Sequence, residues 1–581
     1  MNLVQGIEGV YAFRKSLLIF AFTGRTGSGC STAAQQIAKP FHEIPLSADG
    51  ESSAEQRKIG IAKDFARANW VPFKTVSVSS VISSFLFEND WTSISGLLEE
   101  QKTPPTLRDK VKRIYENVRK NDLFEHFSAE LINGDKTPSS PSLWNFFVST
   151  IDPASASLRA ALEHHFQPFF QTIGDNIRIS GRAITKGTST KTEPYALMKA
   201  VERLIILAKT HDEVLQQPST CISIDAIRNP LELIYLRDRF SSIYVIAITA
   251  DDKERRDRLV ELGLRKTEIA QLDRREYDRD TKHLSSIHSF VAQNLMDCIQ
   301  KADIFISNPG APGDLQQKIR HLSTKLIKSV ALALRPGLVT PTRDERCMQI
   351  AFVAKANSGC ISRQVGAAVT DRNYSIKAVG WNDVAKGQIP CLLRDVDSLL
   401  TGNDNIAFSD FEQKDQSLRN QIAKDNSNRN VFRGEGLRCP FCFKDAYNKV
   451  KNKDNQVHTR ALHAEENAFL QLAKYGSSGI EDGVLYTTAS PCELCSKKAF
   501  QLGIKEIVFI DPYPGISSSH VLAYGPIIDR PKLRLFSGAV GQAYHRLYDP
   551  LLPIKDEYAA RLSHKAEAPP ANQQALQLDT P

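Results

Sequence analysis

Short apolar runs in the first half of the chain alternate with stretches that have helical periodicity. The runs occupy residues 17–22, 221–225, 243–249 and 302–308. The first of them reads as a buried strand, because its apolar residues are continuous rather than alternating. Strands that alternate with helices are typical of a parallel sheet. The pattern therefore predicts a parallel α/β domain over residues 1–330, with inserted helices and loops over residues 52–172.

A linker and a second α/β pattern follow. Paired Pro and Gly signals mark residues 331–342 as the linker. A helix over residues 343–356 comes next, and then a hairpin with strands at 365–369 and 376–380. The remaining helices and strands are expected in the order 463–472, 484–488, 493–502 and 506–510. We expect an α/β/α domain over residues 343–550 and a flexible tail over residues 551–581.

The most specific chemical pattern lies on these last elements. His463 and Glu465 open one helix, and Pro491, Cys492 and Cys495 open the next. One imidazole and two thiolates bind zinc and leave a fourth position open, so Glu465 is a proton shuttle rather than a ligand. The H-x-E…P-C-x-x-C pattern is the signature of zinc nucleobase deaminases. The alternatives are a structural zinc site and unrelated reduced thiols, but the motif contains no fourth ligand.

A second group of zinc-type ligands lies in the long insertion between the hairpin and His463. Cys439 and Cys442 form a C-x-x-C pair, and Cys391 and His458 lie in the same insertion. Four such ligands would close a structural zinc site that holds the insertion to the body of the domain. The competing interpretation is that these thiols are reduced and bind no metal.

A glycine-rich loop between the first strand and a helix predicts a phosphate-binding P-loop. Its residues are Gly24, Arg25, Thr26, Gly27, Ser28, Gly29, Cys30 and Ser31. Cys30 stands where the usual motif has lysine, so the loop lacks the ammonium group that reaches a transferring phosphoryl group. Arg25 or another arginine would have to compensate. Asp225, at the end of a strand, suits Mg²⁺ bound with ATP or GTP. The alternative is a glycine turn that binds nothing.

Residues beside the zinc motif are candidates for substrate binding. Asn382 ends the hairpin, where its amide suits a sugar hydroxyl, and its neighbour Trp381 either supports a base or packs in the core. Arg363 precedes the hairpin and suits a phosphate. Tyr513 follows the last strand at the edge where such sheets bind ligands. The set of candidates is Asn382, Ala464, Tyr513 and Arg363.

Two polar segments of the first half are also candidates. Residues 174–178 predict either a turn at the edge of a nucleotide site or a surface loop. Residues 274–279 are rich in arginine and predict either a lid over phosphates or a solvated helix face.

Composition narrows the setting. The 581-residue chain carries a formal net charge of +8, which fits anionic nucleotides as well as nucleic acid. Its ten cysteines are too few for a disulfide scaffold, which favours a reducing cytoplasm and metal binding. The sequence shows no signal peptide pattern and no apolar run long enough to span a bilayer, so we expect no membrane function.

The second half, about residues 341–550, resembles the cytidine and deoxycytidylate deaminase superfamily, and more closely its deoxycytidylate branch. The first half resembles the nucleoside monophosphate kinase group of P-loop proteins, on the basis of residues 24–31, 224–230 and 302–308. The resemblance implies an N-terminal P-loop NTPase-like domain and a C-terminal domain of cytidine deaminase fold.

In this order, the two halves resemble the bacterial anti-phage deoxycytidylate deaminases. That resemblance implies zinc-dependent conversion of dCTP, dCMP or both to dUTP or dUMP with release of ammonia, which depletes deoxycytidine nucleotides during infection. It also implies a homo-oligomer and a regulatory first half that responds to a nucleoside triphosphate or a small RNA.

Two other functions are compatible with the motifs. One is a cytidine deaminase that acts on RNA or single-stranded DNA, which would need aromatic and basic residues interleaved near the site. The other is a nucleotide kinase with a deaminase-like regulatory domain, against which the missing P-loop lysine argues.

Overall fold

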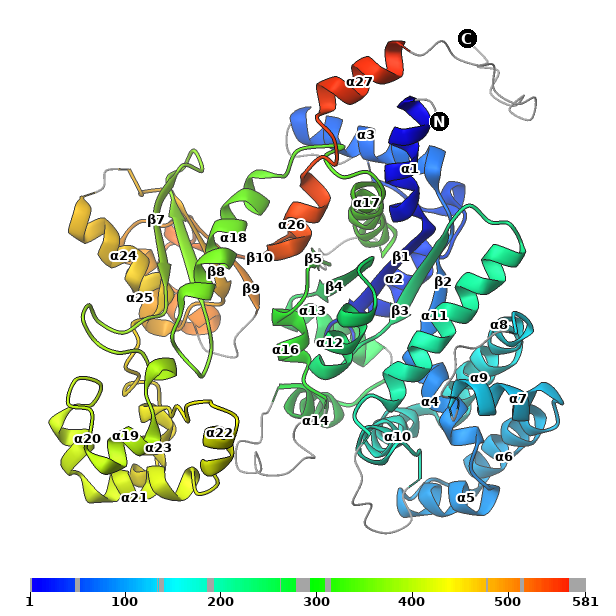
Figure 1. Ribbon diagram of the computed structural model, residues 1–581, viewed down its shortest axis with the longest axis horizontal. Coiled ribbons are helices and arrows are strands. Elements are labelled where there is room, and N and C mark those ends of the chain that lie inside the picture. Colours follow the sequence, from blue (N-terminus) through cyan, green and yellow to red (C-terminus); the bar gives the residue numbers. More distant parts are fainter. Residues whose placement is uncertain are drawn as a thin grey trace.

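The protein contains two β-sheets, each packed against helices (Figure 1). The computed structural model describes residues 3–47, 53–132, 134, 140–184, 193–261, 263–277, 293–308, 315–476, 479–511 and 517–563. Helical clusters extend from both sheets toward the lower edge of the view in Figure 1. Within the described ranges, every helix is too short or too polar to cross a membrane.

The first sheet has the strand order β11-β5-β4-β1-β3-β2. Its strands are β1 (Leu17–Thr23), β2 (Lys74–Ser77), β3 (Thr220–Asp225), β4 (Ile243–Thr249), β5 (Ile304–Ser307) and β11 (Gly538–Ala539). All pairs are parallel except β11 with β5. The predicted parallel strands are confirmed. Because β1 lies between β3 and β4, the chain crosses to either side of β1, and such a switch point opens a crevice at the carboxyl end of the strand.

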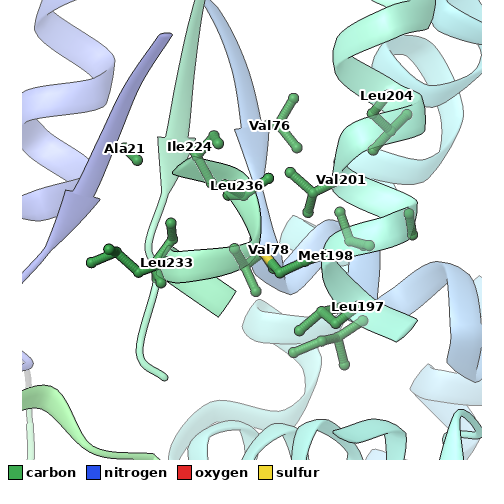
Figure 2. Close-up of a cluster of buried hydrophobic side chains, with 14 of the residues drawn as sticks. Ala21, Val76, Val78, Leu197, Met198, Val201, Leu204, Ile224, Leu233 and Leu236 are labelled. Atoms are coloured by element: carbon green, nitrogen blue, oxygen red, sulfur yellow. The ribbon is translucent and has the colours of Figure 1, made fainter. Parts of the chain in front are cut away.

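Both faces of β1 are buried, as its continuous apolar run predicts. Phe20 and Phe22 face one side, where they join a cluster with α2 and α17 residues. Ala21 faces the other side, where Figure 2 shows it near Ile224 of β3 and side chains of α4, α11 and α12. This alternation fixes β1 in the centre of the sheet and points its carboxyl end at the glycine-rich loop.

Helices cover both faces of the first sheet. Those of the first half are α1 (Leu3–Ser16), α2 (Cys30–Ile37), α3 (Ser53–Asn69), α4 (Val78–Phe87), α5 (Trp91–Glu100), α6 (Pro105–Arg119), α7 (Leu123–Leu131), α8 (Ser142–Phe146), α9 (Asp152–Leu162), α10 (Phe166–Ser180), α11 (Ala196–Val214), α12 (Pro230–Arg239), α13 (Asp252–Glu261), α14 (Lys266–Tyr277), α16 (Leu295–Gln300) and α17 (Leu315–Leu334). The region predicted as inserted helices and loops also contains the edge strand β2, which the sequence pattern missed.

Residues 174–178 form neither a turn nor a loop. They lie inside α10, and Arg178 is only 3% exposed. Its guanidinium donates to Glu232 at 2.7 Å and to Asp175 at 3.3 Å. The predicted turn or surface loop was wrong because these partners satisfy the polar side chains within the packed helix, which a local pattern does not show. The place beside a nucleotide site stays a prediction, since Gly174 and Arg178 line the cavity that the glycine-rich loop borders.

The second sheet has the order β10-β9-β8-β6-β7. Its strands are β6 (Gly366–Thr370), β7 (Ile376–Trp381), β8 (Val484–Ala489), β9 (Glu506–Asp511) and β10 (Lys532–Leu535). Strands β6 and β7 form the predicted antiparallel hairpin, whereas β8, β9 and β10 are parallel. The helices around this sheet include α18 (Arg343–Ala354), α24 (Ala464–Tyr475) and α25 (Glu493–Gln501). The mixed α/β fold predicted for this region is confirmed.

The insertion between β7 and α24 is a helical cluster with its own core. Its helices are α19 (Val396–Thr401), α20 (Asp410–Lys414), α21 (Gln416–Asp425), α22 (Asn430–Gly434) and α23 (Phe443–Lys451). Arg394 is fully buried against the rings of Phe408 and Phe441, with each centroid 4.7 Å from the guanidinium carbon. A carboxylate from Glu412 pairs with it. This arrangement holds the insertion together through a buried charge pair as well as apolar contacts.

The end of the chain returns to the first half. Strand β11 joins the first sheet, α26 (Gly541–Tyr548) packs on α17 and α18, and α27 (Ile554–Ser563) packs on α1. Glu557 of α27 accepts a hydrogen bond from Tyr11 at 3.0 Å and pairs with Arg335. The segment predicted as a flexible tail is therefore helical over Ile554–Ser563, because Glu557 anchors it.

Candidate active site

Two helix N-termini converge on the predicted zinc ligands. His463 is the N-cap residue of α24, and Cys492 is the N-cap residue of α25, with extended backbone angles in both cases. Cys495 lies in the first turn of α25. The positive ends of both helix dipoles therefore face the same point, which favours thiolates and other anions there.

The distances between these side chains fit a zinc ion. The ligand atoms of His463, Cys492 and Cys495 all lie within 4.8 Å of one another, and they form the only such group of three among the described residues. His463 Nδ1 is 3.3 Å from Cys492 Sγ and 3.5 Å from Cys495 Sγ. Tetrahedral zinc with bonds of about 2.0 Å to nitrogen and about 2.3 Å to sulfur separates such atoms by about 3.5 Å.

The electrostatics of the two thiols differ. A hydrogen bond from Cys495 lowers the pKa of the Cys492 thiol, and the bond with His463 lowers it further. The bond to Cys492 raises the pKa of the Cys495 thiol. Of the two thiols, Cys492 is therefore the one that more readily becomes a thiolate, and it lies beside the His463 imidazole. A soft anionic donor set of this kind suits zinc.

Glu465 is buried next to the three ligands. Its side chain is 4% exposed, and its Oε1 accepts a hydrogen bond from Thr487 Oγ1 at 3.0 Å. Burial raises the pKa of the Glu465 carboxyl, against the opposing effects of its backbone N–H, His463 and Thr487. A carboxyl with a raised pKa can both accept and return a proton near neutral pH.

The hairpin approaches α24 closely because of a glycine. A Cβ at Gly380 of β7 would lie 2.3 Å from the carbonyl oxygen of Ala464. Asn467 of α24 donates to the carbonyl of Trp381 at 2.9 Å. Ala464, a predicted substrate-binding residue, is fully buried at this contact. The hairpin thereby fixes the first turn of α24, which carries His463 and Glu465.

Asn382 and Arg363 are held by neighbouring groups. The Asn382 amide accepts from the backbone N–H of Val365 and donates to the carbonyl of Arg363, both at 2.7 Å. The Arg363 guanidinium pairs with Asp511, which also accepts from Gln300 at 3.0 Å. These contacts hold the chain before β6 against the end of β7 and the end of β9. Tyr513 lies outside the described residues.

The four predicted ligands of a second zinc are not gathered into one group. Cys439 Sγ lies 3.5 Å from Asn426 Oδ1, and Cys442 Sγ accepts from Ser362 at 3.5 Å. The His458 ring packs edge-on against Tyr447 at 4.9 Å, and Cys391 begins a short 3-10 helix. The second zinc site stays a prediction.

The glycine-rich loop borders a large cavity of the first half. The cavity has a volume of about 1060 Å³ and lies between the loop, the helical insertion and α17. Gly27 and Gly29 adopt positive φ angles of 87° and 110°, which only glycine adopts without strain. Gly29 is the N-cap residue of α2, so the helix N-terminus opens into the cavity.

Other residues of the predicted P-loop have distinct surroundings. Asp225 lines the cavity, and its carboxylate accepts a hydrogen bond from the Ser31 side chain. Arg25 pairs with Asp252 and, at 2.7 Å, with Asp273. Its charge is therefore directed toward carboxylates. Helix α14 includes part of the arginine-rich segment, whereas residues 278 and 279 lie outside the described residues.

Sequence reasoning missed Thr487 and Asp511. Thr487 is fully buried on β8, on the face that meets Glu465. Side chains alternate between the two faces of a strand, so the face of β8 on which Thr487 lies can be predicted once the position of α24 is known. Asp511 also ends a strand, but its pairing with Arg363 spans 148 positions and has no local signal.

Comparison with known proteins identifies the region that carries this site. Residues 341–511 match the family described as cytidine and deoxycytidylate deaminase zinc-binding region. The deoxycytidylate deaminase of Schizosaccharomyces pombe is 28% identical over 194 residues, 33% of this chain and 44% of that protein. The deoxycytidylate deaminase of phage T2 is 29% identical over 168 residues, 29% of this chain and 78% of that protein. The phage T4 enzyme is 28% identical over 172 residues, 29% of this chain and 76% of that protein.

A solved structure is also similar. The dCMP deaminase from cyanophage S-TIM5 is 22% identical, over 34% of this chain and 100% of that chain, with a TM-score of 0.20. The family match covers residues 341–511 only, and the matched region spans less than half of the fission yeast relative.

Proposed function

We propose that the protein is a zinc-dependent hydrolytic deaminase of deoxycytidine nucleotides, with dCTP, dCMP or both as substrate and dUTP or dUMP plus ammonia as products. The observation that carries this proposal is the convergence of His463, Cys492 and Cys495 at two helix N-termini, with buried Glu465 alongside. The names of the matched relatives support the deoxycytidine nucleotide class.

The side chains of the site have separate tasks in this reaction. His463, Cys492 and Cys495 would hold zinc, which when bound supplies a Lewis acid that makes water acidic near neutral pH. Glu465 takes a proton from the attacking water and returns it to the ring nitrogen of the base. It then takes the proton of the new C4 hydroxyl and passes it to the amine, so that the C4 carbonyl forms as the C4–N bond breaks and ammonia leaves. Thr487 holds the carboxylate in position through its 3.0 Å hydrogen bond. Such acid-base help contributes on the order of a hundred- to ten-thousand-fold in rate.

The first half is proposed as the regulator of this site. Asn294, which precedes α16, donates its backbone N–H to the carbonyl of Arg228 beside the cavity at 2.9 Å. At the other end of α16, Gln300 donates to Asp511. The carbonyl of Asp511 accepts from the N–H of Ser490, two residues before Cys492, at 2.9 Å. Helix α16 is therefore a continuous physical link between the cavity and the zinc residues, which supports coupling.

The biological role proposed is depletion of deoxycytidine nucleotides in defence against phage, in the cytoplasm and as a homo-oligomer. This part rests on the order of the P-loop and deaminase halves in the sequence. The regulator would be a nucleoside triphosphate, bound with Mg²⁺ at Ser31 and Asp225, or a small RNA.

A substrate panel tests the proposed reaction. Purified protein is incubated with cytidine, dCMP, dCTP and cytosine-bearing single-stranded DNA, each with and without ATP or GTP, and the uracil products are separated by chromatography. Conversion of dCMP or dCTP is expected. Conversion of the DNA alone would replace the proposal with polynucleotide deamination.

A further inference from the structure

The cavity of the first half lacks the loop lysine but contains other cations. Position 30 holds a cysteine that is 9% exposed, and burial raises the pKa of its thiol to about 12. Cys30 is therefore neutral at pH 7 and supplies no charge to a phosphate. Arg159 from α9 and Arg228 from the segment after β3 both line the cavity.

Arg228 lies directly against the loop. Its Nη1 donates to Thr26 Oγ1 at 3.1 Å and to Glu276 Oε1 at 3.1 Å, and its side chain is 22% exposed. Its positive charge acts on both Cys30 and Asp225. The guanidinium is thus fixed within reach of the loop residues that face the cavity, and part of its charge is shared with Glu276.

Arg159 faces the same end of the cavity from the helical insertion. Its guanidinium carbon lies 4.7 Å from the centroid of the Phe166 ring, and its charge interacts with both Asp225 and Arg228. The two arginines, one on α9 and one after β3, therefore both lie near Asp225. Two like charges held close together favour an anion between them.

The wall next to Arg159 has a different chemistry. Phe166 and Phe170 stack with ring centroids 4.0 Å apart, and Gln167 and Gln171 line the cavity beside them. Aromatic faces support a base, and amide side chains both donate to and accept from base edges. A volume of about 1060 Å³ is large enough for a nucleotide.

We propose that this cavity binds a nucleoside triphosphate whose phosphates are held by Arg159 and Arg228 in place of the missing lysine, and that it does not transfer the phosphoryl group. This inference rests on the proposed regulatory function of the first half. Transfer needs a cation that follows the moving phosphoryl group. Here the loop offers a neutral thiol, and Arg228 shares its charge with Glu276, so the geometry suits binding without turnover.

Binding of ATP to the full-length Glu465→Gln chain tests this inference. Binding is measured directly, so the result does not depend on deaminase activity. Isothermal titration with Mg²⁺ and ATP is compared with adenosine, which has the base but no phosphates. ATP binding is expected to weaken by about tenfold or more in Arg159→Gln and in Arg228→Gln. Arg113→Gln, an exposed arginine of α6 outside the cavity, should bind ATP as the parent does. Circular dichroism checks that each variant is folded.

The outcomes separate the inference from the deaminase proposal. The inference is overturned if the parent Glu465→Gln chain does not bind ATP, or if the folded Arg159→Gln and Arg228→Gln variants bind ATP as tightly as that parent. Turnover of dCTP or dCMP by the wild-type chain would be unaffected by either result. ADP formed from ATP by the wild-type chain, and lost in Arg228→Gln, would show phosphoryl transfer and contradict the inference. ATP binding as expected in a chain that deaminates nothing would reject the deaminase proposal alone.

Discussion

Glu465 works in a buried position that favours the protonated form of its carboxyl more than water does. Burial raises the pKa of its carboxyl and the charge of Cys492 adds to this, whereas the backbone N–H, His463 and Thr487 lower the pKa. In Glu465→Gln the side chain keeps its size and its hydrogen bond with Thr487 but no longer carries a proton. We expect zinc content and fold to be unchanged and turnover to fall on the order of a hundred- to ten-thousand-fold. Kinetics and metal analysis on the same preparation check this, and normal turnover would reject the role of Glu465.

Thr487 is a positioning residue for Glu465. Thr487→Val keeps the shape and strand propensity of the side chain but removes the hydroxyl that donates at 3.0 Å. We expect roughly a tenfold loss of turnover with unchanged zinc, since one hydrogen bond to a carboxylate is removed. Thr370→Val is the matched control, because Thr370 is also fully buried in this sheet but bonds to the carbonyl of Val484. Equal losses in both variants would mean that Thr487 acts only through stability.

For single residues, the sequence predicts contacts between neighbours in the chain but not contacts between distant segments. His463, Glu465, Cys492 and Cys495 meet because each pair opens a helix, and spacing within one helix turn is readable from the sequence. Asn382 and Arg363 are different, because their hydrogen-bond partners come from other segments. Arg178 is the clearest case, since its partner Glu232 lies 54 positions away.

Glu345 joins several elements at the junction of the two halves. Its carboxylate accepts from Thr342 at the start of α18, from Ala539 of β11 at 3.0 Å and from Tyr548 of α26 at 2.7 Å. Lys328 of α17 lies 3.4 Å away. One buried carboxylate thus connects the linker, the first sheet and α26.

The Glu345 contacts predict a dependence of stability on pH. Burial alone would raise the pKa of the carboxyl, but Lys328 and the hydrogen bonds from Tyr548, Thr342 and Ala539 outweigh it and lower the pKa. The carboxylate therefore stabilises the fold above its unfolded pKa of about 4.3, and this contribution is lost as pH falls through the lower folded pKa.

Glu345→Gln should cost roughly 3 kcal/mol of stability at pH 7, because a carboxamide leaves donors unpaired. Thermal unfolding at pH 7 and at about pH 3.5 measures it. The difference in stability between wild type and Glu345→Gln should be smaller at the lower pH. The control Glu116→Gln, at an exposed position of α6, should be as stable as wild type at both pH values. A difference that is the same at both pH values contradicts the assignment.

Elements with strong periodicity were predictable, and short or distant ones were not. Strands β1, β3, β4 and β8 are continuous buried runs. Strand β2 has only four residues and is partly exposed, so its pattern resembles the loops around it. Strand β11 has two residues, and it pairs with β5 across more than two hundred positions of sequence. Pairing of this kind depends on the tertiary fold rather than on local preference.

The number of zinc ions per chain tests whether the insertion holds a second zinc in addition to the one at His463. The predicted second site in the insertion requires two zinc ions per chain. Cys442→Ser should then lose one zinc and keep deamination, whereas Cys492→Ser should lose the other zinc and all turnover. Elemental analysis of the purified protein measures the ratio. One zinc per chain in the wild type would contradict the second site and leave the site at His463 as the metal centre.

The central claim is that deamination of deoxycytidine nucleotides depends on zinc held by His463, Cys492 and Cys495. The most direct measurement removes zinc with a chelator, returns it in steps, and records metal content and conversion of dCMP and dCTP at each step. Turnover should vanish in the zinc-free protein and return in proportion to zinc bound at this site, with no recovery in Cys492→Ser. Full turnover by zinc-free protein, or zinc binding without conversion of either nucleotide, would contradict the account.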